Sequence, residues 1–207
     1  MNTNFKINIY RFSAFAITLL ICRICINQSM LYIFLIWNLF LALIPLWISD
    51  HLVKQKQLSF IHIPIIALWL LFIPNSPYIL TDLFHLGPRK GSPFWLDLIV
   101  VISFALIGLM VFYRSLIDMI DLAKTKLSSL QMNFIIPITF WLISFGLYLG
   151  RYLRFNSWDI VQHPFRLAKS SYHTLQHKDA LAFSFIFSIF LWFVYLTLTT
   201  FNSKQKQ

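Results

Sequence analysis

The chain has 207 residues, of which 58% are hydrophobic and only 12% are charged. Soluble domains carry about 25% charged residues, so this composition excludes an ordinary soluble domain and indicates a membrane protein. The net charge of +10 does not indicate nucleic-acid binding, because the basic residues lie between apolar runs, where they set topology and meet lipid headgroups. We expect the lipid bilayer as a partner and no nucleic acid.

Apolar runs recur along the whole chain, each near the roughly 20 residues that cross a bilayer. They predict six spans, at about residues 10–26, 30–48, 58–73, 94–113, 133–152 and 180–201. No stretch resembles a separate soluble domain, so we predict one integral membrane domain over residues 1–207, with an all-α polytopic helical bundle as its fold. The first run lacks a small-residue cleavage site and is expected to stay as an anchor helix. Its two cysteines, Cys22 and Cys25, would lie in hydrocarbon, which disfavours a redox or zinc role.

The third run ends at Pro74, and Ser76 followed by Pro77 is typical of a helix N-cap with proline at the first helical position. We therefore predict a short amphipathic or re-entrant helix over residues 77–86. Polar side chains recur along it at i, i+3, i+4 and i+7, which places them on one helix face. They are Tyr78, Thr81, Asp82 and His85.

A carboxylate and an imidazole at this spacing can share a proton, a metal ion or a substrate hydroxyl. Asp82 and His85 are accordingly the candidate catalytic residues, with Tyr78 and Thr81 as candidate substrate-binding residues. No metal site is assigned, and the pattern identifies no cofactor. The alternative is an interfacial helix whose polar stripe merely faces water.

Two connections carry apolar residues at roughly helical spacing. The connection over residues 114–131 is predicted to lie on the membrane surface, and the one over residues 153–179 is similar. In the second, Ser157 is expected to cap a helix that Pro164 interrupts.

A second polar motif follows the fifth span. Arg151 and Arg154 can present two guanidinium groups to a phosphate or carboxylate, or pair with an acidic residue, for which Asp82, Asp159 and Asp97 are the candidates. Asn156 and Asp159 join them as candidate substrate-binding residues. Arginines that reach to the headgroups at the end of a span are the alternative.

Successive spans alternate in direction, so the connections after spans three and five share one side of the membrane. Nine Lys and Arg lie on the side of the termini and eight on the other, which leaves the positive-inside rule almost balanced. If arginines of the second motif serve a site, the balance favours cytoplasmic termini in the cell membrane.

The run LWLLFIPNSPYILTDLFHL, together with LGRYLRFNSWDI, resembles a family of mainly bacterial membrane proteins known as domain of unknown function 1361. The first motif includes Pro74, Asn75, Pro77, Tyr78, Thr81, Asp82, His85 and Leu86, and the resemblance covers about residues 30–200. It implies a multi-spanning membrane protein but no reaction, substrate or cofactor.

Three functions remain open at this point. The first is a headgroup-level site that binds or processes an anionic substrate, either lipid-linked or a phosphorylated small molecule. The second is a small-solute transporter, which the absence of ionisable residues near the span centres disfavours. The third is a non-catalytic assembly subunit. The sequence does not decide whether the protein is an enzyme.

Overall fold

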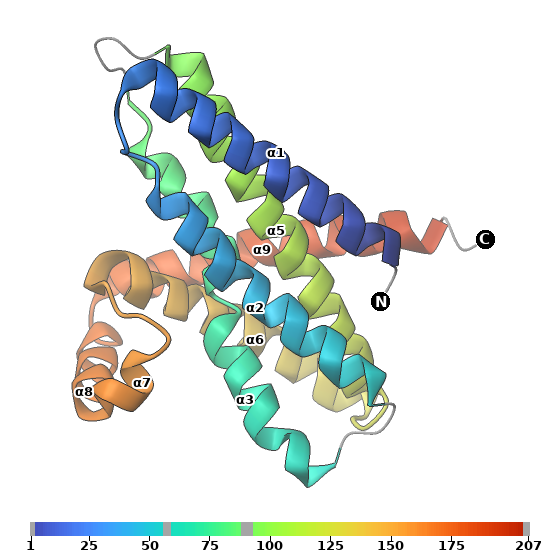
Figure 1. Cartoon of the computed structure of the whole chain (residues 1–207). Coiled ribbons are helices and arrows are strands. Elements are labelled where there is room, and N and C mark those ends of the chain that lie inside the picture. Colours follow the sequence, from blue (N-terminus) through green and yellow to red (C-terminus); the bar gives the residue numbers. More distant parts are fainter. Residues whose placement is uncertain (1–2, 56–58, 88–92, 205–207) are drawn as a thin grey trace. The chain divides into compact units, whose positions relative to one another are not determined.

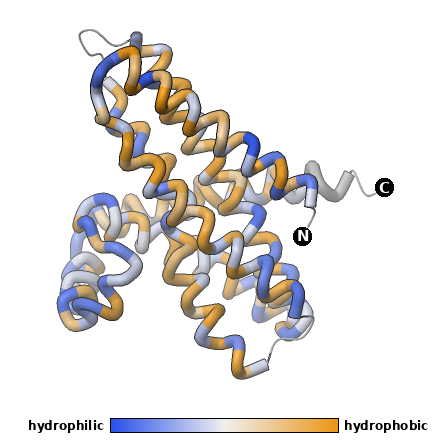
Figure 2. Tube along the Cα trace, viewed as in Figure 1, coloured by the Kyte–Doolittle hydropathy of each residue, from blue (hydrophilic) through white to orange (hydrophobic). Residues whose placement is uncertain are grey.

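The computed structural model describes residues 3–55, 59–87 and 93–204, with side chains up to residue 200. Within these ranges all regular secondary structure is helical (Figure 1). Six stretches are long and apolar enough to cross a membrane, and hydrophobic residues run along them (Figure 2). They are Thr3–Asn27, Phe34–Lys54, Phe60–His85, Phe94–Lys124, Ser129–Leu153 and Lys178–Thr200. The predicted all-α membrane fold is confirmed; the predicted start of the third span at residue 58 lies outside the described residues.

The chain divides into two compact units, residues 1–119 and 120–207. The first contains α1 (Thr3–Asn27), α2 (Phe34–Lys54), η1 (Phe60–His62), α3 (Ile63–Phe72), α4 (Asn75–Tyr78), η2 (Ile79–His85) and most of α5 (Phe94–Lys124). Helices α1, α2 and α5 share one hydrophobic core. Its buried members include Ala16 and Leu20 of α1, Leu35, Leu39 and Leu46 of α2, and Val100, Phe104 and Val111 of α5.

Helix α2 carries Pro45 in its interior, where proline removes a backbone donor. Two serines from neighbouring helices bond to carbonyls near it: Ser76 Oγ donates to Ala42 O at 2.7 Å, and Ser115 Oγ donates to Pro45 O at 2.9 Å. Ser115 Oγ also accepts a hydrogen bond from Trp69 Nε1 at 2.8 Å. Side-chain hydroxyls are a usual way to satisfy backbone near proline in apolar surroundings, and here they tie α2, α3, α4 and α5 together.

The prediction of a separate surface segment over residues 114–131 is wrong. Helix α5 continues through Lys124, because no proline or glycine interrupts this stretch. Its charged side chains pair along the helix: Arg114 with Asp118 one turn on, and Lys124 with Asp121 at 3.2 Å. Such pairs are the ordinary i,i+3 and i,i+4 neighbours on a helix surface.

The second unit contains α6 (Ser129–Leu153), α7 (Asp159–Gln162), α8 (Pro164–Thr174) and α9 (Lys178–Lys204). Helix α6 begins with a capping box, in which Gln131 N donates to Ser128 Oγ and Ser128 N donates to Gln131 Oε1. Helices α6 and α9 pack through aromatic rings: Tyr148 lies 5.6 Å from Phe183 between ring centroids. A second such contact joins Phe140 and Tyr195 at 5.7 Å.

The predicted cap at Ser157 is wrong. Helix α7 begins at Asp159 and ends at Gln162. The residue at its N-cap position is Trp158, which makes no side-chain cap bond. The predicted interruption at Pro164 is confirmed: α7 ends at Gln162, His163 leaves the helical conformation, and Pro164 starts α8, where its missing N–H has no intrahelical role.

Candidate functional site

The signature segment, residues 74–86, is not the single α-helix that we predicted over residues 77–86. It forms the single turn of α4 and then the 3₁₀ helix η2. Pro77 has no N–H to donate to Ile73 O, which instead accepts from Ser76 N at 3.2 Å, the shorter span of a 3₁₀ turn. The expected N-cap role of Ser76 is also wrong, since its hydroxyl donates to α2.

The signature segment pairs with α2 at steps of one helical turn. The ring of Phe34 meets the ring of His85 edge to face, with centroids 5.3 Å apart. One turn further along α2, Asn38 Nδ2 donates to Asp82 Oδ2 at 2.8 Å. The bond from Ser76 to α2 follows one turn later, so the two segments run antiparallel and in register.

The four predicted site residues of this segment differ in exposure. Asp82 is 1% exposed and Thr81 is buried, Tyr78 is half-buried, and His85 is exposed. Thr81 Oγ1 donates to Tyr78 O at 2.7 Å, a local backbone bond. A buried carboxylate is destabilising unless it accepts hydrogen bonds, and the Asn38 amide donates one to Asp82. Asn38 is therefore a site residue that the sequence analysis did not predict. Asn38 is a polar side chain one helical turn after Phe34 in an otherwise apolar run, and that isolated polar position is the signal that could have identified it.

A second buried polar group lies in the same unit. Arg23 Nε donates to Asp97 Oδ1 at 2.8 Å, and both side chains are 2% exposed. The guanidinium lies over the Tyr32 ring at 4.9 Å and also donates to Ser29 O. The counter-ion of Asp97 is therefore Arg23, and not one of the arginines of the second motif that we considered. The sequence signal that could have predicted this pair is that Arg23 and Asp97 are ionisable residues of opposite charge, each near the end of an apolar span.

The second motif lies where α6 ends. Arg154 terminates the helix in the left-handed conformation, with φ 58° and ψ 31°, and its N–H bonds back to Leu149 O. Glycine or asparagine is usual at such a position, because a side chain there is strained. Arg154 is exposed, Arg151 one turn earlier is half-buried, and Arg166 lies 5.8 Å from the centre of the Phe155 ring.

The remaining residues of the second motif shape the turn after α6. The Asp159 carboxylate accepts from Asn156 N at 2.6 Å, which closes the turn before α7. One carboxylate oxygen of Asp159 is therefore already engaged in a hydrogen bond with the backbone. The Asn156 side chain is exposed. The signature segment and the second motif belong to different units, so their convergence on one site stays a prediction.

Among the described residues, no three His, Cys, Asp or Glu side chains stand close enough together to hold a metal ion. Cys22 and Cys25 are free thiols on the exposed side of α1.

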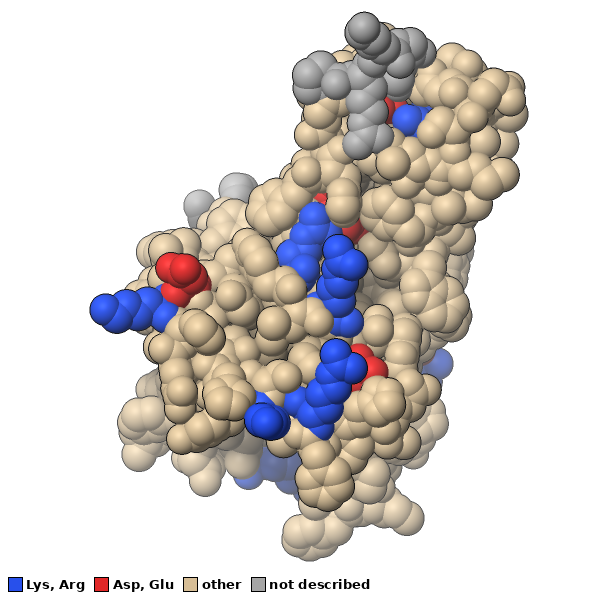
Figure 3. Space-filling model, turned by 90° about the vertical axis from the view of Figure 1, so that its left-hand side faces the viewer, with Lys and Arg blue, Asp and Glu red and all other residues tan. Residues whose placement is uncertain are grey.

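In the part of the chain that the structure describes, six long apolar helical stretches and large exposed hydrophobic side chains define a polytopic helical membrane protein. Much of the face in Figure 3 carries no Lys, Arg or Asp. The chain belongs to the family described as protein of unknown function (DUF1361), whose profile matches residues 37–194. That match includes both polar motifs. No curated protein and no solved structure matches the chain significantly.

Proposed function

We propose that the protein binds or processes an anionic substrate, lipid-linked or phosphorylated, at the headgroup level of the cell membrane. Arg151 and Arg154 hold the anion through charge-assisted hydrogen bonds, and Asn156 with Asp159 borders it. Asp82 and His85 carry the proton-transfer or polarising role.

The observation that supports this proposal is the backbone of Arg154. A residue with a side chain in the left-handed region costs roughly 1–2 kcal/mol, and glycine avoids that cost. Strain of this kind gathers at functional sites, where a particular side chain is needed at a particular place. An exposed guanidinium at the end of a span, one turn after Arg151, suits an anion at the headgroup level.

The signature segment supplies the second part of the proposal. Asn38 holds one oxygen of the buried Asp82 carboxylate, which is how a reactive carboxylate is kept in one orientation. His85 lies one 3₁₀ turn away and is exposed, so a substrate from the headgroup region can reach its ring. In the topology that we propose, six spans alternate in direction and the termini are cytoplasmic, so this segment and the second motif lie on the opposite, non-cytoplasmic side.

Lipid retention tests the anion site. The full chain is purified into nanodiscs containing phosphatidylcholine and phosphatidic acid, and retained phosphatidic acid is counted by native mass spectrometry. Arg154→Gly keeps the left-handed turn while it removes the guanidinium, so retention falls about tenfold or more, as expected for a lost charge-assisted bond. Lys126→Gln, which removes an exposed cation at the other end of α6, is the matched control.

Glycerol phosphate added as a soluble competitor separates the two substrate sources. Displacement of the lipid by this competitor indicates a free phosphorylated substrate, and no displacement indicates a lipid-linked one. Equal retention by wild type, Arg151→Gln and Arg154→Gly, at equal abundance, would overturn the anion site.

A non-catalytic role is the second candidate, and the Asn38–Asp82 bond favours it. A buried pair of this kind also acts as a structural lock between α2 and η2. The swapped pair Asn38→Asp with Asp82→Asn keeps one carboxylate and one amide. If the swap restores abundance and every phenotype of the single variants, Asp82 is a lock and its proposed chemistry is wrong.

A further inference from the structure

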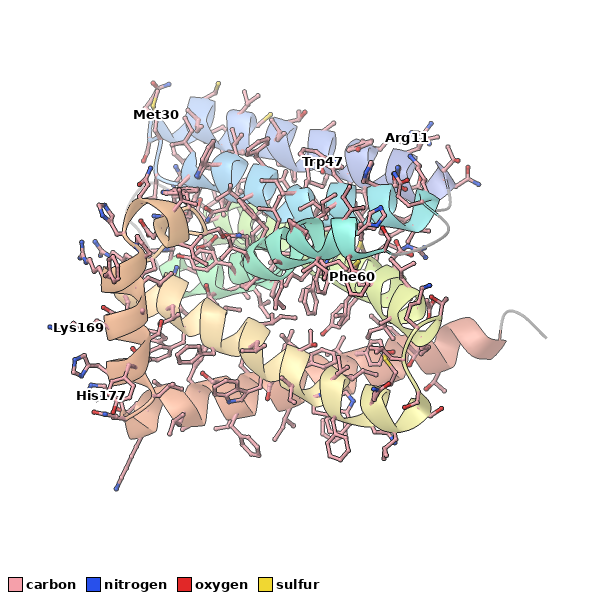
Figure 4. The ribbon with its side chains drawn as sticks, turned by 90° about the horizontal axis from the view of Figure 1, so that it is seen from below. Arg11, Met30, Trp47, Phe60, Lys169 and His177 are labelled. Atoms are coloured by element: carbon pink, nitrogen blue, oxygen red, sulfur yellow. The ribbon has the colours of Figure 1, made fainter. Side chains whose placement is uncertain are left out.

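Helix α8 runs across the ends of α6 and α9 within the second unit. Figure 4 shows it lying across these ends, between the end of α6 and the start of α9, and Figure 1 shows it beside them at the lower left. When α6 and α9 cross a bilayer, a helix with this direction extends along the membrane surface rather than through it.

The exposure of α8 divides it into distinct sides. One side faces the unit and is mostly small and polar: Ser170 and Ser171 are half-buried and Thr174 is buried, with the half-buried Leu167 beside them. The aromatic side chains are instead on the exposed side. Phe165 is 89% exposed and Tyr172 is 64% exposed. Val161, just before the helix, is 81% exposed. The large apolar groups therefore face outward, which requires an apolar environment outside the described unit.

A cationic edge lies beside the aromatic one. On a helix, Arg166, Lys169 and His173 recur at three- and four-residue steps, so they share one edge next to Phe165. All three are exposed, and no acidic residue occurs between Ile160 and Lys178. Lys169 and His177 point away from the ribbon in Figure 4. Aromatic and basic side chains on adjoining edges are typical of helices that lie at an anionic bilayer surface.

We propose that α8 is a membrane-surface helix that docks on anionic lipid, with Phe165 and Tyr172 in the boundary of headgroups and acyl chains and Arg166 and Lys169 at the phosphates. Charge complementarity selects this occupant: a purely apolar partner would leave the cations unmatched, and a neutral leaflet offers them no counter-charge. The proposal does not depend on a substrate site at Arg151 and Arg154.

Hydrogen–deuterium exchange of the full chain tests the proposal. The protein is placed in nanodiscs of phosphatidylcholine alone and in nanodiscs with added phosphatidylglycerol, and exchange is followed in peptides from residues 160–175. Each cation near an anionic surface contributes about fivefold to binding, so two give about 30-fold slower exchange in the anionic discs. Arg166→Gln with Lys169→Gln removes this lipid dependence. Lys124→Gln with Lys126→Gln, the same charge change at the end of α5 and in the turn before α6, keeps it.

Phe165→Ser separates the apolar contribution, because it speeds exchange in both kinds of disc while the difference between them persists. Equal exchange of the wild-type chain in the two lipids would overturn the proposal without any variant. Protection that rises with the number of chains per disc, rather than with lipid charge, would show that a second copy covers α8 and would overturn it as well.

Discussion

Gly108 of α5 faces the backbone carbonyl of Ser76 in α4. A Cβ atom built on Gly108 would lie 2.5 Å from Ser76 O and 3.4 Å from the side chain of Ile79, and real Cβ atoms do not come so near to a carbonyl. The signature segment thus rests directly on α5 on one side and bonds to α2 on the other. Its backbone has a fixed place in the first unit, which is a condition for any role of Asp82 or His85 in chemistry.

Gly108→Ala should destabilise the first unit. The added methyl group meets backbone rather than a flexible side chain, so the cost is about 1–3 kcal/mol, as for overpacked cores. Thermal unfolding in detergent measures it. Gly87→Ala is the matched control: nothing lies within 4 Å of a Cβ at Gly87, so its effect stays within about 0.5 kcal/mol. Equal stability of the two variants would contradict the close approach to Ser76.

Arg23→Met should be strongly destabilising, because it leaves the Asp97 carboxylate buried without its cation. The expected loss is about 3–5 kcal/mol, the range for one broken half of a buried ion pair. Replacing both residues by apolar side chains, as in Arg23→Met with Asp97→Leu, should lose much less, since no charge then remains buried. A double variant as unstable as Arg23→Met alone would mean that the pair is needed for more than charge compensation. Urea unfolding of the detergent-solubilised protein compares the variants.

The pairing of Arg23 with Asp97 marks a limit of prediction from sequence. Hydropathy predicted six spans, because a bilayer imposes one length and one composition on every helix that crosses it. Partners 74 residues apart follow no period, and only the packing of α1 against α5 brings this pair together.

The 3₁₀ form of η2 was missed for a related reason. The pattern of Tyr78, Thr81, Asp82 and His85 fits an α-helix, whereas the backbone bonds around Pro77 decide the local geometry.

Ser115→Ala should cost about 1–3 kcal/mol, because it leaves the buried Trp69 Nε1 donor and the Pro45 carbonyl without their shared hydroxyl. Ser13→Ala is the matched control. Ser13 is also buried, but its hydroxyl has no hydrogen-bond partner, so its loss is neutral or slightly stabilising. Unfolding midpoints of the two variants in the same detergent decide the prediction. A neutral Ser115→Ala would show that the serine does not support α2 at its proline.

Asn38→Asp should be more damaging than Asn38→Ala. Alanine removes one donor from Asp82 and costs about 1–3 kcal/mol, whereas aspartate places a second carboxylate beside a buried one and adds repulsion. Folded yield in detergent gives the ranking. At low pH the gap between the two variants narrows, because protonation of either carboxyl restores a donor. If Asn38→Asp and Asn38→Ala are both as stable as wild type at neutral pH, the bond to Asp82 does not stabilise the folded chain.

Arg154→Gly should keep the stability of the second unit or raise it by up to about 1 kcal/mol, because glycine adopts the left-handed conformation without strain but loses more entropy on folding. Arg151→Gly is the matched control: it lies within α6, where glycine costs about 1 kcal/mol relative to alanine. Unfolding curves of both variants are compared with that of the wild type.

A loss above 1 kcal/mol for Arg154→Gly would mean that contacts of the guanidinium hold the turn. Its strained backbone would then be a structural feature and would no longer favour an anion site. If instead Arg154→Gly keeps its stability while it retains less phosphatidic acid, the Arg154 side chain serves to bind the anionic lipid, and the chain tolerates a strained backbone at this position in order to place it.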